Sequence, residues 1–362
     1  KIDKVPYPAV KSPDGAAWIV LDAKANASYA VAYALLKDKA EVYRSRAAVA
    51  GKGFSAAAGS FVVKDTPEVR KALPGLLEKR HAEAFALADA AAVEKAPVKF
   101  PRLGLFQSWR GNMDEGWTRY VFDDMGIAYK TLHNEDIKGT KEKKPDLRAD
   151  FDVIVFADEN ANTIKGVRPG AGGPGGGPGG ESPMFRMFQQ NVPPEYEGGI
   201  GQEGVDNLKA FVEKGGVLVT MNRAAEFAIS DFSAPARNAL QGLEQAKFFC
   251  PTSILKILVD NETPIGYGMP REAAAMFVNS LALDTFSPPF DWDRKVVATY
   301  PDDNVLLSGW LLGEEYLTRK AAVVDTKYKD GRIVLIGIRC QNRAQAHGTY
   351  KFLLNALLYP GQ

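Results

Sequence analysis

The heptapeptide Phe151-Asp-Val-Ile-Val-Phe-Ala157 decides the fold class of this 362-residue chain. Its apolar residues run almost without interruption instead of alternating with polar ones, which is typical of a strand buried on both faces of a sheet. Val217-Leu-Val-Thr-Met221 is a second run of this kind, and it follows a helical stretch that ends at Gly215-Gly216. Buried strands that alternate with helices predict an α/β fold, a doubly wound and mostly parallel sheet with helices on both faces.

The same alternation continues outward from these two strands. We expect the strands near residues 103, 129, 153, 217 and 333 to be mostly parallel neighbours in one sheet. Helices are predicted between and after them, over 113–125, 204–214 and 349–358. Residues around 230–330 break this rhythm, and we interpret them as an insertion of mixed strands.

A smaller α/β region precedes this domain. Strands are predicted at 17–21, 41–44 and 61–63, and Asp65-Thr-Pro-Glu68 predicts a helix start with Thr66 as the N-cap and Pro67 in the first turn. The Ala-rich stretch from Glu78 to Val93 is predicted to be helical. We therefore expect an N-terminal connecting region over 1–98 and a second domain over 99–362.

Charge and hydropathy exclude two classes of partner. The 45 Lys and Arg residues balance 44 Asp and Glu residues, so the chain lacks the basic excess of a dedicated nucleic-acid binder. No run of 18 apolar residues predicts a membrane span. The sequence begins Lys1-Ile-Asp-Lys-Val-Pro6, without an initiating Met or the apolar core of a signal peptide, which we interpret as a piece of a longer or processed protein.

Metal and cofactor chemistry has little material in this sequence. The three His residues, His81, His133 and His347, are far apart, and no Cys-x-x-Cys or His-x-x-x-His spacing occurs. We expect no metal site and no cofactor. Cys250 and Cys340 are the only cysteines, and whether they form a disulfide stays open.

One segment has low complexity. Residues 170–180 contain eight Gly, two Pro and one Ala, within a Gly-rich loop over 166–181. A phosphate-binding loop would end in Gly-Lys-Ser/Thr or open a helix with Gly-x-Gly-x-x-Gly, and neither pattern is present. We therefore interpret this segment as an excursion within a long loop from 158 to 198.

The candidate site follows from the expected sheet, because ligands bind outside the carboxyl ends of its strands. Polar and aromatic residues follow each of these strands and are the crevice candidates: Trp109, Asp114, Glu115, Arg119, Asp158, Asn222, Arg343 and His347.

A structural role for the same residues is the competing interpretation. Asp114 and Glu115 fall in a first helical turn, where acidic groups interact well with the helix dipole. Trp109 and Trp117 would then be buried packing, and Asp114 with Arg343 a structural ion pair.

Four segments carry a resemblance to a known family: Met113–Arg119, Gly199–Leu218, Gly331–Gly337 and Arg343–Asn355. They resemble the C-terminal region of large bacterial zinc carboxypeptidase-like proteins, in which a metallopeptidase domain precedes a domain with a class I glutamine amidotransferase-like fold. The resemblance spans most of residues 100–358. It implies a flavodoxin-like domain, a periplasmic or extracellular location, and an upstream peptidase domain of the same polypeptide as partner. The zinc-binding His-x-x-Glu pair of the peptidase is absent, so no catalytic residue is carried over to this chain.

The amidotransferase resemblance also predicts where a nucleophile would stand. Active members place a Cys on a sharp strand-to-helix turn, with an oriented base nearby. The corresponding turn follows Met221 and reads Asn222-Arg-Ala224, without a thiol or hydroxyl. Cys340 lies seven residues before His347, and a pair of these two stays open.

Two functions from different classes remain. The first is a non-catalytic accessory or binding domain of a secreted zinc carboxypeptidase-like protein, with a peptide or glycan as ligand. The alternative is a hydrolase that uses carboxylates and His347 at the crevice, since paired carboxyls with separated pKa values can perform acid–base catalysis. The missing nucleophile favours the first.

Overall fold

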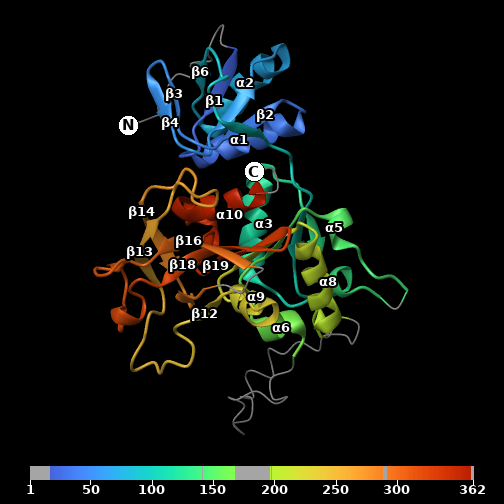
Figure 1. The fold of residues 1–362 in the computed structure, drawn as a ribbon, viewed down its shortest axis with the longest axis vertical. Helices are drawn as coiled ribbons and strands as arrows, with labels where there is room; N and C mark the ends of the chain where they lie inside the picture. The colour runs from blue at the N-terminus through green and yellow to red at the C-terminus, as the bar shows by residue number, and fades with distance from the viewer. Residues whose placement is uncertain (1–16, 141, 168–195, 197, 288–291, 360–362) are drawn as a thin grey trace, which may run out of the picture.

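The computed structural model describes residues 17–140, 142–167, 196, 198–287 and 292–359. Two large sheets organise these residues: a five-stranded sheet built before residue 98 and a twelve-stranded sheet built after residue 102 (Figure 1). A mixed α/β fold is thereby confirmed. Residues 168–181 of the predicted Gly-rich loop lie outside the described residues.

The N-terminal sheet has the strand order β6-β1-β5-β2-β7, and all neighbours in it are antiparallel. Alternate residues of each strand face opposite sides, so Ile19 and Leu21 pack with helices α1 and α2, whereas Val20 packs with the β3–β4 hairpin. The elements are β1 (Trp18–Leu21), α1 (Asn26–Lys37), β2 (Val42–Ser45), β3 (Val49–Gly51), β4 (Phe54–Ala56), β5 (Phe61–Lys64), α2 (Pro67–Arg80), β6 (Phe85–Leu87) and β7 (Lys95–Pro97).

One half of the large sheet is parallel. Its order is β19-β11-β10-β8-β9, which is 2-1-3-4-5 read from the other edge when these strands are counted along the chain. This confirms the prediction that the five strands are parallel neighbours. The strands are β8 (Leu103–Phe106), β9 (Lys130–Leu132), β10 (Val153–Phe156), β11 (Val217–Met221) and β19 (Gly331–Ile336).

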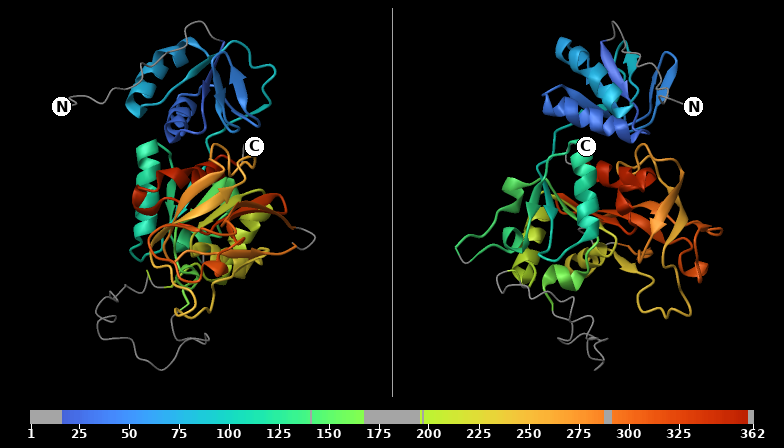
Figure 2. Two further views of the ribbon diagram at one scale, coloured as in Figure 1. Left: turned by 90° about the vertical axis from the view of Figure 1, so that its left-hand side faces the viewer. Right: turned by 180° about the vertical axis from the view of Figure 1, so that it is seen from behind.

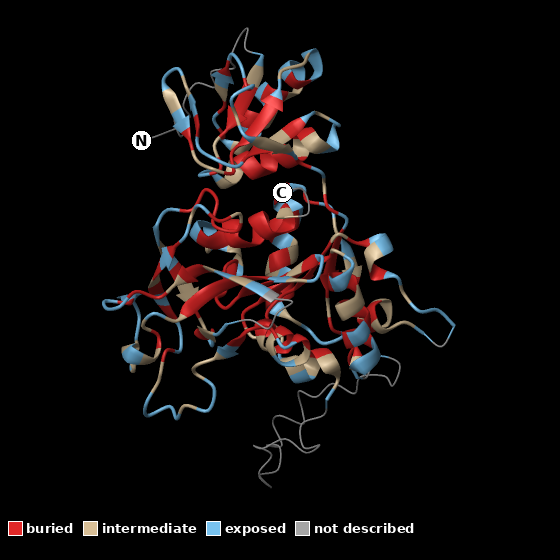
Figure 3. Cartoon of the chain, in the orientation of Figure 1, coloured by how far each residue is buried: buried red, intermediate tan, exposed pale blue. Residues whose placement is uncertain are grey.

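Helices cover both faces of this parallel half, as Figures 1 and 2 show. Val153 and Val155 of β10 share a core with α3 and α10, whereas Ile154 and Phe156 share another with α8 and α9. Burial on both faces explains the continuous apolar runs of these strands, which are buried throughout (Figure 3). The helices are α3 (Met113–Met125), α4 (Asn134–Lys138), α5 (Leu147–Asp150), α6 (Ala161–Lys165), α8 (Gly201–Glu213), α9 (Ala224–Phe232) and α10 (Tyr350–Leu357).

The other half of the large sheet is antiparallel and continues from β19 in the order β18-β16-β13-β14. It is built from the stretch that the sequence singled out around 230–330. Its elements are β12 (Ala236–Asn238), β13 (Ser253–Val259), β14 (Glu272–Phe277), β15 (Leu283–Thr285), β16 (Trp292–Thr299), β17 (Leu306–Ser308) and β18 (Ala321–Tyr328), with the short 3-10 helices η2 (Glu314–Tyr316), η3 (Asn342–Ala344) and η4 (His347–Thr349).

The predicted continuous helix over Glu78–Val93 is wrong. Helix α2 begins after Thr66, whose hydroxyl accepts a hydrogen bond from the Val69 N–H as predicted, but it ends at Arg80. His81 adopts a left-handed conformation there, with φ of 51°, and β6 follows. Alanine content favours helix only weakly, and pairing of β6 with β1 outweighs it.

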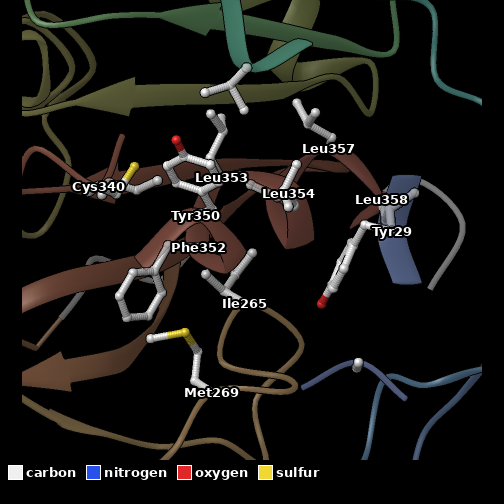
Figure 4. Close-up of a cluster of buried hydrophobic side chains, with 14 of the residues drawn as sticks. Tyr29, Ile265, Met269, Cys340, Tyr350, Phe352, Leu353, Leu354, Leu357 and Leu358 are labelled. Atoms are coloured by element: carbon white, nitrogen blue, oxygen red, sulfur yellow. The ribbon is translucent and has the colours of Figure 1, made fainter. Parts of the chain in front are cut away.

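The N-terminal region packs on the large domain through α10 (Figures 1 and 4). Asn355 of α10 is fully buried, and its Oδ1 accepts hydrogen bonds from Tyr29 Oη at 2.6 Å and from Arg44 Nη2 at 2.5 Å. Its Nδ2 donates to the carbonyls of Ile265 and Tyr267 at 2.8 and 2.9 Å. One amide therefore joins α1, β2, α10 and the loop before β14.

Candidate functional site

The candidate site lies at the carboxyl ends of the parallel strands. The chain passes from β8 outward to the edge strand β9 and returns to β10 on the other side of β8, so the topology reverses between β8 and β10. Ligands of open α/β sheets bind outside the carboxyl ends of strands at such a reversal. The residues that follow β8, β10, β11 and β19 therefore define the candidate site.

Asp158, two residues beyond β10, lies at the centre of a buried ion-pair network. Its side chain is 2% exposed. Arg223 donates to it through its backbone N–H, Nε and Nη2, each at 3.0 Å, and Asn222 Nδ2 donates at 3.1 Å. Arg339, which follows β19, donates from Nη2 at 2.6 Å. A carboxylate offers about four lone-pair sites, so these five bonds leave Asp158 no free acceptor.

Arg339 links Asp158 to a second buried carboxyl, Asp114 in the first turn of α3. Its Nη1 donates to Asp114 Oδ2 at 2.8 Å, whereas Oδ1 of Asp114 is buried without a hydrogen-bond partner among the described residues. Burial raises the pKa of Asp114 to about 6; Arg339 opposes the shift and the charge of Asp158 adds to it. Two carboxyls that share one guanidinium thus differ in their protonation near pH 6.

Strand β11 passes into α9 through a sharp turn at Asn222. Its φ is 51°, in the left-handed region that few residues other than glycine adopt. The side chain is fully buried, and Nδ2 also donates to the carbonyl of Asn279 at 3.2 Å. A strained strand-to-helix turn is where hydrolases of the nucleophile-elbow type present a reactive side chain. Here the turn presents a carboxamide that already donates to Asp158.

A second polar group lies beside the network. Ser108 Oγ donates to Glu159 Oε2 at 2.9 Å, and Asn112 Nδ2 donates to the same oxygen at 3.3 Å and to the Asp158 carbonyl at 2.9 Å. In the described part of the chain no histidine contacts the Ser108 hydroxyl, which a nucleophilic serine needs as a base. This group therefore ties the loop after β8 to the loop after β10.

The exposed part of the site is aromatic. Trp109 is 38% exposed, stacks on His133 at 3.7 Å between ring centroids, and meets Tyr196 at 4.5 Å. Trp109 Nε1 donates to Glu135 Oε2 at 3.0 Å. His133 Nδ1 lies 2.9 Å from the Gln107 carbonyl, which can only accept, so Nδ1 carries the proton and Nε2 is left for other partners. We call Trp109, His133 and Tyr196 the aromatic platform.

The structure separates the eight predicted site residues. Asp114, Asp158 and Asn222 meet in the buried network, and Trp109 belongs to the platform. Arg119 instead pairs with Glu115 at 2.5 Å and bonds Thr131 Oγ1 at 3.1 Å, which directs this pair toward β9.

The last two predicted residues, Arg343 and His347, are both exposed. The His347 ring stacks on Tyr350 with 4.9 Å between centroids, and its carbonyl accepts from Asn26 Nδ2 at 2.7 Å. The expected ion pair between Asp114 and Arg343 is wrong, because Arg339 takes that place. Whether any of the eight residues binds a ligand stays a prediction.

The cysteines give no nucleophile. Both are free and buried. Burial raises the pKa of the Cys340 thiol to about 12, and its Sγ lies 3.6 Å from Met221 Sδ. The open pairing of Cys340 with His347 is therefore not formed, because the thiol points into the core while the imidazole is exposed.

Sequence reasoning missed several functional candidates. Arg339 and Arg223 follow their strands just as Arg343 and Asn222 do, so the strand-end signal was present but did not discriminate between neighbours. His133 follows β9 and was considered only as a zinc ligand. Its stacking with Trp109 depends on two loops 24 residues apart in sequence, which no local pattern reveals.

The described ranges also bear on metals, membranes and cavities. Within them no group of three or more His, Cys, Asp or Glu could hold a metal ion, and no helix is both long and apolar enough to cross a membrane. A pocket of 360 Å³ lies on the antiparallel half, between β13, β16 and Arg271, and shares no residue with the candidate site. The expected absence of a metal stays a prediction.

No family model and no curated protein matches this sequence. Among solved structures, it is similar to a cytoplasmic protein from Salmonella typhimurium (TM-score 0.41, 14% identity, covering 72% of this chain and 98% of that one). A ThuA-like protein from Bacteroides uniformis gives 0.37 and 13%, covering 72% and 89%. A GMP synthase protein from Thermoplasma acidophilum gives 0.38 and 11%, covering 71% and 94%. At these scores the likenesses carry no argument about function.

Proposed function

We propose that this chain is a non-catalytic binding domain with a flavodoxin-like, class I glutamine amidotransferase-like fold, and that its ligand is a peptide or glycan held at the aromatic platform. The observation that carries the proposal is Asn222. The turn that would present a nucleophile holds a fully buried carboxamide bonded to Asp158. The site therefore has the position for a nucleophile without the atom.

The state of the carboxyls supports the same proposal. Acid–base catalysis needs a carboxyl with a free oxygen within reach of the substrate. Asp158 is saturated by five donors, and Asp114 is 4% exposed with one oxygen bound to Arg339. Glu159 is occupied by Ser108 and Asn112.

The platform supports binding at the adjacent surface. Exposed aromatic rings offer a large apolar area with few rotatable bonds, and indole and phenol groups can also donate hydrogen bonds. Trp109 and Tyr196 are 38% and 41% exposed. A polar ligand with flat apolar faces, such as a sugar ring or a peptide, fits this chemistry.

The association with an upstream zinc carboxypeptidase domain, and a periplasmic or extracellular location, belong to the proposal as well and rest on the sequence resemblance. A metallopeptidase domain with His-x-x-Glu encoded before Lys1 would support them. An open reading frame that starts at Lys1 would contradict them.

The proposal is tested by a binding and turnover screen with peptidoglycan fragments, peptides and glutamine. We expect binding of one ligand class without turnover, and loss of that binding in Trp109→Ala. Trp310→Ala is the matched control, because Trp310 is 65% exposed and follows β17 in the antiparallel half. Turnover that Asp114→Asn or Glu159→Gln abolishes would establish the hydrolase alternative instead.

A further inference from the structure

Arg44 of β2 is a buried cation at the junction between the N-terminal region and the large domain. It is 2% exposed, and its guanidinium lies 5.9, 5.8 and 5.4 Å from the ring centroids of Tyr29, Phe61 and Tyr267. These rings come from α1, β5 and the loop before β14. Arg44 is thus enclosed by both parts of the chain.

The hydrogen bonds of Arg44 are incomplete. Nε donates to the Gly59 carbonyl at 3.2 Å, and Nη2 donates to Asn355 Oδ1. Nη1 is buried and has no partner among the described residues. Both acceptors that Arg44 does contact are neutral, and its ion pairs with Asp or Glu within the described ranges number zero.

Two further groups give this junction a positive balance. Tyr33 Oη on α1 is buried without a partner among the residues described, and Arg44 acts on it electrostatically. Lys351 of α10 is 5% exposed and lies one helical turn before Asn355, on the same face. Asp22 is the carboxylate whose charge acts on Lys351. Two cations and one anion leave one positive charge.

Burying a charge without a counter-charge costs several kcal/mol, and leaving a buried donor unpaired adds to that cost. A water molecule at Nη1 would satisfy the donor but would not neutralise the guanidinium. A monovalent anion would do both, and the stem of Arg44, packed among three rings, admits only a small one.

We propose that the junction binds one small monovalent anion, chloride under ordinary conditions, against Arg44 Nη1 and Tyr33 Oη. The anion acts as a third contact between the N-terminal region and α10, beside the Asn355 amide. It is independent of the ligand proposed for the aromatic platform, which involves none of these residues.

The first test needs no variant. Crystals of the full chain grown or soaked in bromide should show an anomalous peak within hydrogen-bond reach of Arg44 Nη1 and Tyr33 Oη. A light peak without anomalous signal at that place would mean water, and would overturn the proposal.

The second test is thermal unfolding at constant ionic strength, with gluconate replaced by chloride. The wild-type midpoint should rise saturably by about 2 °C. Arg44→Met should abolish this dependence, and the milder Tyr33→Phe should weaken it. Arg46→Met is the matched control, since it removes the same charge from an exposed side chain paired with Glu94 and should keep the full chloride response. A wild-type midpoint that does not respond to chloride would contradict the proposal.

Discussion

A carboxylate that accepts five hydrogen bonds makes a poor catalytic base, and Asp158 is such a group. Its donors come from β11, α9 and the turn after β19, so the residue closes the carboxyl ends of the sheet by electrostatics. At this scale the site is a filled crevice, in which charged residues serve each other. The side chains left for a ligand are the aromatic ones at its border.

Asp158→Asn should be strongly destabilising. The change leaves Arg223 and Arg339 buried with one neutral partner, and breaking a buried ion pair in this way costs about 4 kcal/mol. Urea denaturation measures the loss. Asp302→Asn is the control, because its pair with Arg319 is exposed and should contribute little. Equal stability of the two variants would show that the network is not buried as described.

The stability of the chain should depend on Asp114 in the acid range. Because the pKa of Asp114 is raised to about 6 in the folded chain, against about 3.9 in an unfolded one, the folded state holds its proton more tightly. Stability from this group is therefore full below about pH 4 and falls as the pH rises through 6, by roughly 3 kcal/mol in all.

Asp114→Asn removes that titration. The difference in unfolding free energy between wild type and variant should shift in favour of the variant as the pH rises from 4 to 7. Parallel pH profiles for the two proteins would show that Asp114 titrates normally.

At the scale of elements, helix α3 could be predicted to the residue because both of its ends carry local signals. Asn112 Oδ1 accepts from the N–H groups of Asp114 and Glu115, and Gly126 ends the helix with φ of 72°. The end of α2 at Arg80 carries no such signal, and only pairing of β6 with β1 decides it. The order of the parallel strands followed from their burial, whereas the antiparallel half depends on long-range register that sequence periodicity does not encode.

Asn112→Ala should lower stability by about 1 kcal/mol through loss of the helix cap. It should also loosen the loop after β10, because Asn112 Nδ2 holds the Asp158 carbonyl. Asn112→Asp keeps the cap but not that donor. Chemical denaturation of both variants separates the two roles, and an Asn112→Ala variant as stable as wild type would rule out the cap.

For the whole molecule, the junction at Asn355 should make the two regions unfold together. Calorimetry of the wild-type chain should show one transition. Asn355→Leu removes the acceptor for Tyr29 and Arg44, so the N-terminal region should melt first and separately. A variant that still unfolds in one transition would mean that apolar packing alone couples the regions.

The site could be located from the sequence, but its internal pairing could not. The strand-end rule brought Asp114, Asp158 and Asn222 to one place, because it depends only on topology. It could not assign their partners, since neighbouring residues such as Arg339 and Arg343 differ only in the direction that a turn gives them. Arg343 has φ of 52° and is exposed, whereas Arg339 points into the network.

The central claim is that the chain binds a ligand at the aromatic platform and does not transform it. The most direct measurement is calorimetric titration of peptidoglycan fragments into wild type, Trp109→Ala and Trp310→Ala, with the recovered ligand analysed by mass. The account predicts at least about tenfold weaker binding in Trp109→Ala alone, and fragments recovered unchanged. Equal affinities in all three proteins, or fragments cleaved by wild type, would contradict it.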